Sequence, residues 1–436
     1  MLDGENNFMK DVSNLITTRL KADHIAFLNS VAEVAAHNQV SVYVVGGFVR
    51  DLLLNIKNVD IDLVVEGDGI VFAEKLAEKF NGRTSKYKKF GTATLMLQGR
   101  PSIDVATART ESYSCPAALP DVEPSSIKQD LARRDFTVNS MAVKLSGRGT
   151  FYLIDLFGGE IDLKDGLIRV LHDQSFVDDP CRLFRAIRFE QRLEFCINGQ
   201  TKQLMRSAIK NNLIDQLSGD RLMNEMKILL SEADPVRCVD RMRELLLFQA
   251  IAPEILDDDF HWTIMNKIHS TLAWADMIPM TTKPEAWFIY FHTLFMITDD
   301  NVFKRMMMRL NFPGNIYGRM CSDRECFVEA MNDFSEEREL KPSEIYDIFS
   351  KQSPEVVILM LAACSNKRMK EYVELYFKKY CASAKIELNG DDLIGMGMEP
   401  GASFKDVFKA LRDARINGQV TSRDEEIDLV ESLFLK

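Results

Sequence analysis

The sequence lacks long apolar runs, a signal peptide and closely paired cysteines. Its longest uninterrupted apolar stretch, in a chain of 436 residues, runs only from Val356 to Cys364, and a membrane-spanning helix needs about 20 such residues. The first twelve residues, MLDGENNFMKDV, are acidic and amide-rich, whereas a secretory signal starts basic and then turns apolar. The eight cysteines include no CxxC pair, which predicts reduced, buried thiols rather than disulfides or a zinc site. We therefore expect a cytoplasmic protein with no membrane segment.

The sequence also lacks an excess of basic residues. It has 54 Lys and Arg against 65 Asp and Glu, a net charge of −11. Since bulk affinity for phosphate comes from clustered cations, this balance argues against a protein that coats nucleic acid non-specifically. Local basic clusters remain, and each is interpreted as a solvated surface unless another feature marks a site. The clusters lie at Lys86, Lys88 and Lys89, at Arg182, Arg185 and Arg188, at Lys304, Arg305 and Arg309, and at Lys367, Arg368 and Lys370.

Hydrophobic patterning divides the chain into two parts. Its length predicts two to four domains, and 46% hydrophobic residues are enough for real cores. Up to Leu156, short β-rich runs alternate with helical patterns at His24–Asn38 and Ile70–Phe80. After Leu156 the strands are expected to stop, and apolar residues recur at helical spacing. The predicted strands are Val42–Val45, Ile61–Val65, Thr92–Leu97, Ile103–Ala106, Ala142–Leu145 and Phe151–Ile154, and the later helical patterns are Leu183–Phe189, Leu222–Leu230, Arg241–Phe248, Ala286–Met296 and Glu355–Ala363. The predicted fold class is α+β.

Two adjacent glycines mark the first candidate site. Gly46 and Gly47 lie between the predicted strand Val42–Val45 and a helical pattern over Phe48–Leu54. Such a turn lets backbone N–H groups approach an anion, and the helix N-terminus adds partial positive charge, to which Arg50 adds a full one. The pattern predicts a phosphate cradle. A purely structural turn is the alternative, and no third glycine follows at the spacing of a dinucleotide-binding fingerprint.

Two aspartates follow at the start of the next predicted strand. Asp60 and Asp62 are two residues apart, so both side chains would point to the same face of a strand. Neighbouring carboxylates repel each other, and their most plausible use is to hold a divalent cation such as Mg²⁺ with substrate phosphates. Asp104, on another predicted strand, is a candidate third carboxylate. The alternative is that these acids cap turns or pair with Lys57.

The order of motifs carries a family resemblance. GGFVRD, VDIDLVV, LARRDFTVNSMA, DLFGG, DDPCRLFRAIRF and GDRLMNEMKILL follow one another between Val42 and Leu230. This series resembles the class II tRNA nucleotidyltransferase and bacterial poly(A) polymerase family, and GDDLIGMGMEPG near the C-terminus is a looser match. The resemblance implies a nucleotidyltransferase (polymerase-beta-like) head with a mixed sheet, followed by an all-helical neck, body and tail. The expected segments are a leader at 1–26, the head at 27–157, the neck at 158–245, the body at 246–340 and the tail at 341–436.

The resemblance also implies a reaction and roles for particular residues. The reaction is Mg²⁺-dependent transfer of CMP or AMP from CTP or ATP to the 3′ end of tRNA, by two-metal catalysis with no nucleic-acid template. The implied metal ligands are Asp60 and Asp62, and Asp104 is kept as the candidate third catalytic carboxylate because of its place on a predicted strand. The implied triphosphate contacts are Gly46, Gly47 and Arg50, and the implied contacts to the incoming ribose and phosphate are Arg133, Arg134, Asp135 and Asn139.

A later motif is predicted to choose the base. Asp179 and Arg182 lie three residues apart at the start of a helix, and together they offer one acceptor and one donor fork. Cytosine and adenine present an amine beside a ring-nitrogen acceptor, so this pair fits them and mismatches uracil and guanine. The alternative is that Asp179 only caps the helix. Arg185 and Arg188 continue the stripe towards phosphate or RNA.

The family resemblance leaves the nucleotide specificity open. In this family the loop between the metal strand and the Arg-Arg-Asp motif is needed for adding A, and here the segment from Arg109 to Ser126 is full length. We therefore favour addition of the terminal A, alone or as the last step of CCA. The alternatives are a CC-adding enzyme, a bacterial poly(A) polymerase and a catalytically inactive RNA-binding module. The implied partners are the tRNA acceptor end and elbow, with ATP or CTP.

Overall fold

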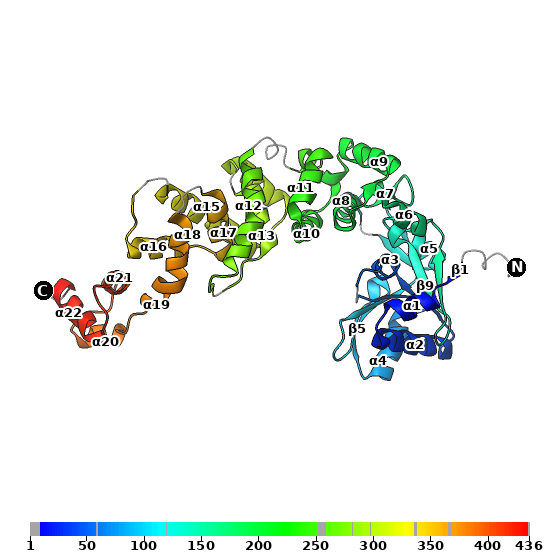
Figure 1. The fold of residues 1–436 in the computed structure, drawn as a ribbon, viewed down its shortest axis with the longest axis horizontal. Helices are drawn as coiled ribbons and strands as arrows, with labels where there is room; N and C mark the ends of the chain where they lie inside the picture. Colours follow the sequence, from blue (N-terminus) through cyan, green and yellow to red (C-terminus); the bar gives the residue numbers. More distant parts are fainter. Residues whose placement is uncertain are drawn as a thin grey trace. The chain divides into compact units, whose positions relative to one another are not determined.

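The structure, a computed structural model, describes residues 9–57, 60–118, 120–251, 259–280, 282–296, 298–334, 338–364 and 368–434 (Figure 1). The chain forms two compact units, Met1–Arg221 with Glu244–Ile251, and Leu222–Arg243 with Ala252–Lys436. The predicted leader is not separate, since its described residues pack in the first unit, and the predicted neck is divided between the two units. No helix in the described parts of the chain is long and apolar enough to cross a membrane.

The first unit contains a mixed eight-stranded sheet. Strand β3 pairs in parallel with β6, and the other neighbours are antiparallel. The order across the sheet is β1 (Met9–Asp11), β10 (Phe151–Asp155), β9 (Met141–Leu145), β2 (Ser41–Val45), β3 (Asp62–Glu66), β6 (Ile103–Thr107), β5 (Thr92–Met96) and β4 (Arg83–Tyr87). All six predicted strands are confirmed, with ends shifted by one residue at most. The edge strands β1 and β4 were not predicted, because neither shows an apolar alternation.

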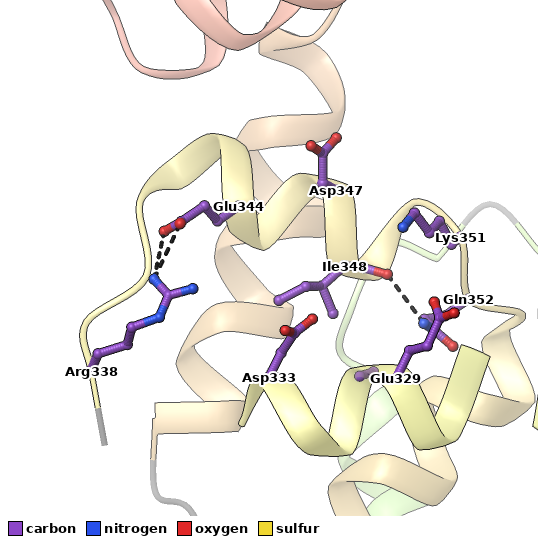
Figure 2. Close-up of a pocket in the computed structure, with 9 residues that line it drawn as sticks. Glu329, Asp333, Arg338, Glu344, Asp347, Ile348, Lys351 and Gln352 are labelled. Carbon is purple, nitrogen blue, oxygen red and sulfur yellow. Dashed lines mark hydrogen bonds and ion pairs between the residues drawn. The ribbon is translucent and has the colours of Figure 1, made fainter. Parts of the chain in front are cut away.

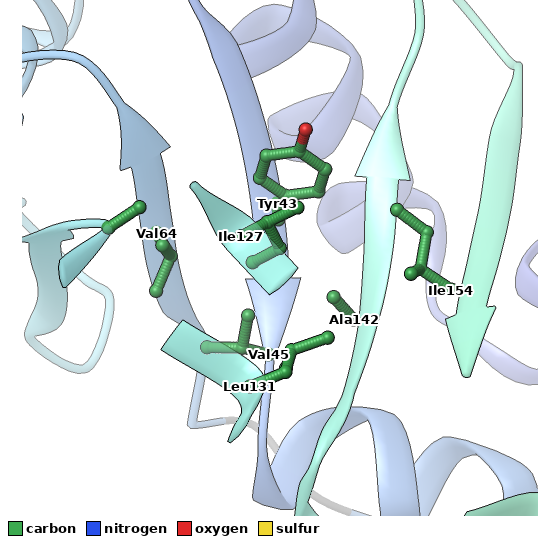
Figure 3. Close-up of a cluster of buried hydrophobic side chains, with 8 residues drawn as sticks. Tyr43, Val45, Val64, Ile127, Leu131, Ala142 and Ile154 are labelled. Carbon is green, nitrogen blue, oxygen red and sulfur yellow. The ribbon is translucent and has the colours of Figure 1, made fainter. Parts of the chain in front are cut away.

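The two faces of this sheet are covered by different helices. Helices α2 (Ala22–His37) and α4 (Gly69–Phe80) pack against one face and against each other (Figure 1). On the other face, Tyr43, Val45 and Val64 form a buried cluster with side chains of α5 (Ile127–Ala132) (Figure 3). Since side chains alternate along a strand, Asp62 shares the face of Val64. The sheet therefore presents Asp62 on the face that α5 partly covers.

Several short elements complete the first unit. The predicted loop Arg109–Ser126 contains a hairpin of β7 (Arg109–Ser112) and β8 (Asp121–Pro124). The expectation that strands stop after Leu156 is wrong, because β11 (Leu167–Ile168) and β12 (Cys196–Ile197) form a small parallel pair. The helices of this region are α6 (Gly159–Asp165), α7 (Ser175–Asp178), α8 (Cys181–Leu193) and α9 (Gly199–Lys210).

The described part of the second unit is helical, as predicted. Helix α17 (Pro354–Ala363) is buried on all sides from Val356 to Ala362, which explains the longest apolar run in the sequence. The predicted helix Arg241–Phe248 is displaced, because α11 (Pro235–Glu244) begins six residues earlier and ends before Leu246, whose φ is +63°. The other helices include α12 (Asp259–Ala275), α13 (Ala286–Phe295), α14 (Asp300–Arg309), α15 (Gly314–Asp333), α16 (Pro342–Phe349), α18 (Arg368–Leu375), α20 (Gly390–Gly395), α21 (Ser403–Ile416) and α22 (Arg423–Phe434).

The cysteines are all free thiols. Only Cys181 and Cys238 are buried, and Cys115, Cys196 and Cys381 are exposed. The expectation of burial is therefore wrong for most of them. Exposure of a thiol is compatible with the predicted reduced state, which does not require burial.

Candidate active site

Two aspartates lie side by side on the central strands. Asp62 of β3 and Asp104 of β6 are register partners in the parallel pair, so their side chains project from the same face as neighbours. Thr94, the register partner of Asp104 on β5, donates its hydroxyl to Asp104 Oδ1 at 2.8 Å. These residues line a cavity of about 290 Å³, which Arg133 and Arg134 also line. The cavity thus brings two carboxylates together with the side chains of Arg109, Arg133 and Arg134.

The predicted pairing of Asp60 with Asp62 along one strand is wrong in detail. Strand β3 begins only at Asp62, so strand alternation does not orient the exposed Asp60, and the strand neighbour of Asp62 is Asp104. Desolvation and then the Asp104 carboxylate raise the pKa of Asp62 to about 6, with a further rise from Asp60 and an opposing effect of Arg134. The carboxylates therefore repel one another at this point of the sheet.

This donor set fits a magnesium ion carried with substrate. In the described parts of the chain, no three carboxylate, histidine or cysteine groups form a ready-made metal cage. Magnesium is usually held by one or two carboxylates and by substrate phosphates rather than by such a cage. Asp62 and Asp104 supply two hard oxygen donors on one face, and a bound cation would relieve their repulsion.

The glycine turn forms the predicted cradle, with a different arginine. Gly46 has φ +68° and precedes helix α3 (Gly47–Leu54). A Cβ atom on Gly46 would lie 3.0 Å from Arg134 Nη1, so the guanidinium of Arg134 rests against the turn. Because β2 runs antiparallel to β3, with Val44 opposite Leu63, the turn after β2 lies next to Asp62. The cradle, Arg134 and the first carboxylate therefore adjoin.

Arg50 does not face this cradle, contrary to the prediction. Its guanidinium is buried, with Nε donating to Asp51 Oδ1 at 2.8 Å and Nη1 donating to Asn139 Oδ1 at 2.8 Å. It also lies 5.1 Å from the ring centre of Phe189. The carboxamide of Asn139 donates in turn to Asp135 Oδ1 at 3.0 Å. Arg50 and Asn139 therefore belong to a buried hydrogen-bond network that holds Asp135.

Asp135 is also occupied within the protein. Its Oδ1 accepts from Asn139 and from the Phe136 N–H at 2.8 Å, and its Oδ2 accepts from Arg185 Nε at 2.8 Å and Nη2 at 2.5 Å. Four hydrogen bonds fill the acceptor positions of a carboxylate. Contrary to the expectation, the contacts within the described part of the chain therefore leave Asp135 no acceptor position for a ribose hydroxyl. Arg185 is a structural partner here, and Arg188 is buried rather than presented to RNA.

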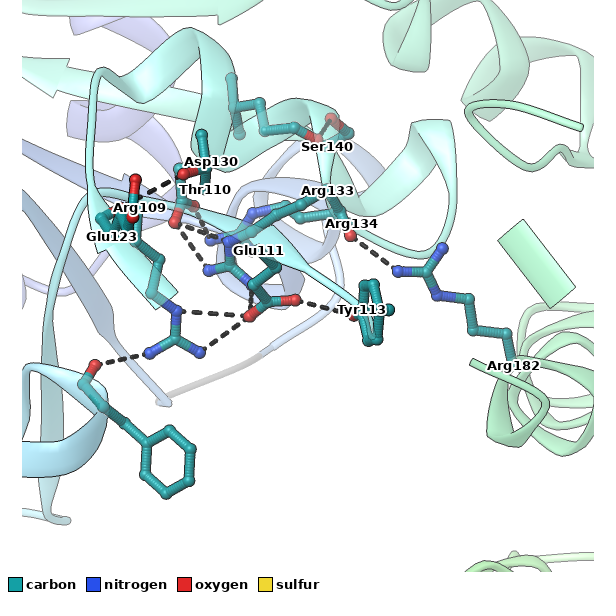
Figure 4. Close-up of polar contacts among 12 residues, drawn as sticks. Arg109, Thr110, Glu111, Tyr113, Glu123, Asp130, Arg133, Arg134, Ser140 and Arg182 are labelled. Atoms are coloured by element: carbon teal, nitrogen blue, oxygen red, sulfur yellow. Dashed lines mark hydrogen bonds and ion pairs between the residues drawn. The ribbon is translucent and has the colours of Figure 1, made fainter. Parts of the chain in front are cut away.

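Two further carboxylates hold the arginines of the cavity (Figure 4). Asp130, fully buried on α5, accepts from Arg133 Nη2 at 2.6 Å and from Arg134 Nη2 at 2.9 Å. Glu111 of β7 accepts from Arg133 Nη1 at 2.7 Å and from the Tyr113 hydroxyl at 3.0 Å. Burial would raise the pKa of Asp130, but the two guanidinium groups outweigh it and lower that pKa.

Arg182, one of the two residues predicted to choose the base, lines a second cavity of about 190 Å³ together with Tyr113 and Arg133; Asp179 does not line it. Arg182 Nη2 donates to the Arg133 carbonyl at 2.7 Å, whereas its buried Nη1 has no hydrogen-bond partner among the described residues. Asp179 Oδ1 accepts from the Cys181 N–H at 3.0 Å, so the capping alternative holds for that oxygen. Since Arg133 lines both cavities, one nucleotide can extend from the carboxylates to Arg182.

Arg221 also binds Asp179. Its Nη2 donates to Asp179 Oδ1 at 2.6 Å, and its Nη1 donates to the Ala117 carbonyl at 2.7 Å. These bonds leave Asp179 Oδ2 without a hydrogen-bond partner within the described part of the chain. Asp179 and Arg182 thus keep one open acceptor atom and one open donor atom.

Four residues of the site were missed from the sequence. Asp130 had a usable signal, because it lies three and four residues before the two arginines on a helix. Glu111 and Tyr113 had none, since their partners are distant in the chain. The role of Arg221 also depends on a distant partner, Asp179.

The helical unit contains a cavity of different character (Figure 2). This hollow of about 210 Å³ is lined by the carboxylates of Glu329, Asp333, Glu344 and Asp347. Arg338, one of its cations, pairs with Glu344 at 3.0 Å. Because like charges repel, this cavity is unsuited to a triphosphate.

Comparison with known proteins agrees with this geometry. The Poly A polymerase head domain family matches residues 42–169, and a family described as the probable RNA and SrmB-binding site of polymerase A matches residues 194–258. The chain is 38% identical to an A-adding tRNA nucleotidyltransferase of Geobacter sulfurreducens over 97% of its own length, but it spans only 48% of that relative. It is 28% identical to an A-adding tRNA nucleotidyltransferase of Halalkalibacterium halodurans, over 99% of this chain and 97% of the relative.

A solved structure extends the likeness to the whole chain. The apo form II structure of a CCA-adding enzyme is 34% identical, with a TM-score of 0.83, over 98% of this chain and 99% of that one. This coverage includes the head sheet with its carboxylates and the helical second half. The chain is therefore a member of the class II tRNA nucleotidyltransferase and poly(A) polymerase family.

Proposed function

We propose that this protein transfers AMP from ATP to the 3′ end of a tRNA ending in CC and releases pyrophosphate. The observation that carries this proposal is the register pair of Asp62 and Asp104 beside the Gly46 turn and Arg134. Carboxylates next to an anion cradle suit a reaction in which a triphosphate is cleaved at the α-phosphate. Two relatives that match 97% and 99% of this chain are both named A-adding tRNA nucleotidyltransferases, which supports the choice of A.

Different residues of the site bind the triphosphate and the base of the nucleotide. Asp62 and Asp104 would hold Mg²⁺, which would supply charge to neutralise the triphosphate and to favour deprotonation of the RNA 3′-OH. Arg134 and the N–H groups of the Gly46–Gly47 turn hold the phosphates. Asp130 positions Arg133 and Arg134 for this contact by accepting from both guanidinium groups.

The base is selected by two open polar atoms. The 6-amino group of adenine donates to Asp179 Oδ2, and a ring nitrogen accepts from Arg182 Nη1. Guanine and uracil present a carbonyl towards Asp179 and a ring N–H towards Arg182, so they leave the buried Arg182 Nη1 unpaired, which costs about 1–3 kcal/mol. Cytosine offers the same two groups as adenine, so this pair alone does not separate ATP from CTP.

The test is an incorporation assay with three tRNA substrates, ending at the discriminator base, at C and at CC. Each nucleotide triphosphate is supplied alone and together with the others. AMP added only to the CC end supports the proposal, and full CCA on the bare end makes A addition the last of three steps. CMP without AMP, long A tails on unrelated RNA, or no incorporation would each contradict it.

Variants test the assigned roles in the same assay. Asp62→Ala and Asp104→Asn are expected to abolish incorporation while tRNA binding is retained, and Asp165→Asn, an exposed aspartate on α6, serves as the matched control. Chelation of divalent ions should stop the reaction, and Mg²⁺ should restore it. Arg182→Ala should reduce the preference for ATP over GTP and UTP. Unchanged preference would remove Arg182 from base selection. The cytoplasmic location remains a prediction from the N-terminal sequence.

A further inference from the structure

The order of strands separates the two sides of the carboxylate pair. The Gly46 turn follows β2, which is the neighbour of β3 on the side away from β6. Strands β5 and β4 lie on the opposite side, beyond Asp104. In nucleotidyl transfer the attacking oxygen and the leaving pyrophosphate are roughly in line. If the triphosphate lies at the Gly46 turn, the attacking RNA end therefore approaches over β5 and β4.

An aromatic side chain lies on that side of the cavity. Tyr87, the last residue of β4, lines the cavity of the carboxylates and is 53% exposed. Its register partner is Thr92, which shares a face of β5 with Thr94, the partner of Asp104. Tyr87 therefore projects from the same face as Asp104. Two strand spacings of ~4.8 Å and a two-residue offset of ~6.6 Å separate the backbones of Tyr87 and Asp104 by about 12 Å.

Cations flank this aromatic residue. Lys88 and Lys89 follow it in the short turn Lys88–Phe90, and both are exposed. In the described part of the chain neither has a carboxylate partner. The turn is fixed to the active site, because Arg109 Nη1 donates to the Phe90 carbonyl at 2.7 Å. An exposed aromatic face beside lysines binds the bases and phosphates of single-stranded RNA.

We propose that Tyr87 is the stacking platform for the terminal base of the RNA 3′ end, with Lys88 and Lys89 on the adjoining phosphates. The attacking hydroxyl is thereby held beside Asp104 and Asp62. This inference rests on the proposed function, because it identifies the seat of the second substrate in that reaction. The edge strand β4 thereby aligns the RNA 3′ end with the carboxylates.

The test separates binding of the RNA from binding of the nucleotide. Tyr87→Ala is expected to raise the KM for a tRNA ending in CC about tenfold and to leave the KM for ATP within about twofold. Tyr87→Phe, which keeps the ring, should restore the wild-type KM. Met96→Ala is the matched control, because Met96 is an exposed side chain on the same face of β5 outside the cavity. An unchanged KM for tRNA in Tyr87→Ala, or equal increases for both substrates, would overturn the proposal.

A binding measurement keeps the proposal testable without turnover. An RNA with 2-aminopurine at its 3′ terminus loses fluorescence when that base stacks. Wild type and Tyr87→Phe should quench it, and Tyr87→Ala should not. If wild type adds AMP but quenching is independent of Tyr87, the proposed function stands and the seat is wrong. If quenching depends on Tyr87 but no AMP is added, the seat stands and the proposed function fails.

Discussion

Replacing Asp130 should loosen the active site without touching any group that reacts. Asp130→Asn keeps the shape of the side chain, but it removes a buried charge that accepts from Arg133 and Arg134. Breaking a buried ion pair costs about 3–5 kcal/mol. The two arginine side chains are 19% and 18% exposed, so water recovers part of that loss, and we expect about 3 kcal/mol.

The measurement must report on the first unit alone. The three tryptophans, Trp262, Trp274 and Trp287, all belong to the second unit, so their fluorescence does not follow the loss. Amide hydrogen exchange in peptides from α5 does, and about 3 kcal/mol corresponds to ~100-fold faster exchange. The KM for ATP should also rise, because both phosphate-binding arginines lose their anchor. Exchange and KM values equal to those of wild type and of Asp165→Asn would refute the reasoning.

Three more outcomes follow from other contacts. Arginine neighbours lower the pKa of both Asp130 and Asp135 against the effect of burial. The stabilisation that these two carboxylates give is therefore present at neutral pH, and it is lost as pH falls below 3.8, the ordinary pKa of an aspartate. Urea unfolding of the first unit, followed by hydrogen exchange at pH 5 and pH 3, should show this loss, and equal stability at both would contradict it. Gly46→Ala should cost about 1–2 kcal/mol for its positive φ and lower kcat/KM for ATP more than for tRNA; equal effects would argue against the cradle. His292→Phe removes the contact of a fully buried imidazole with Asp323 at 3.0 Å. Since Asp323 keeps Arg319 as an ion-pair partner, the loss should destabilise the second unit by about 1–3 kcal/mol, seen as a shift of its tryptophan-monitored unfolding; an unshifted transition would show that the contact is not stabilising.

The sequence determined the elements whose signals are local. Short β-rich runs predicted six strands of the head sheet within one residue, and helical spacing over Glu355–Ala363 predicted helix α17. The Gly46–Gly47 turn was also readable, because adjacent glycines between a strand and a helix allow a conformation and an approach that other residues do not. The order of motifs between Val42 and Leu230 was enough to indicate the family.

The tertiary structure decided which charged groups meet. Asp62 and Asp104 are 42 positions apart in the chain, and only the parallel pairing of β3 with β6 makes them neighbours. Arg50 and Asp135 were expected to face the nucleotide because motif position does not report burial. The fold instead supplies each with protein partners, as the cost of burying an unpaired charge requires. Tyr87 was not predicted as a site residue for a different reason. The polar edge strand β4 lies near the carboxylates only because of the strand order of the sheet.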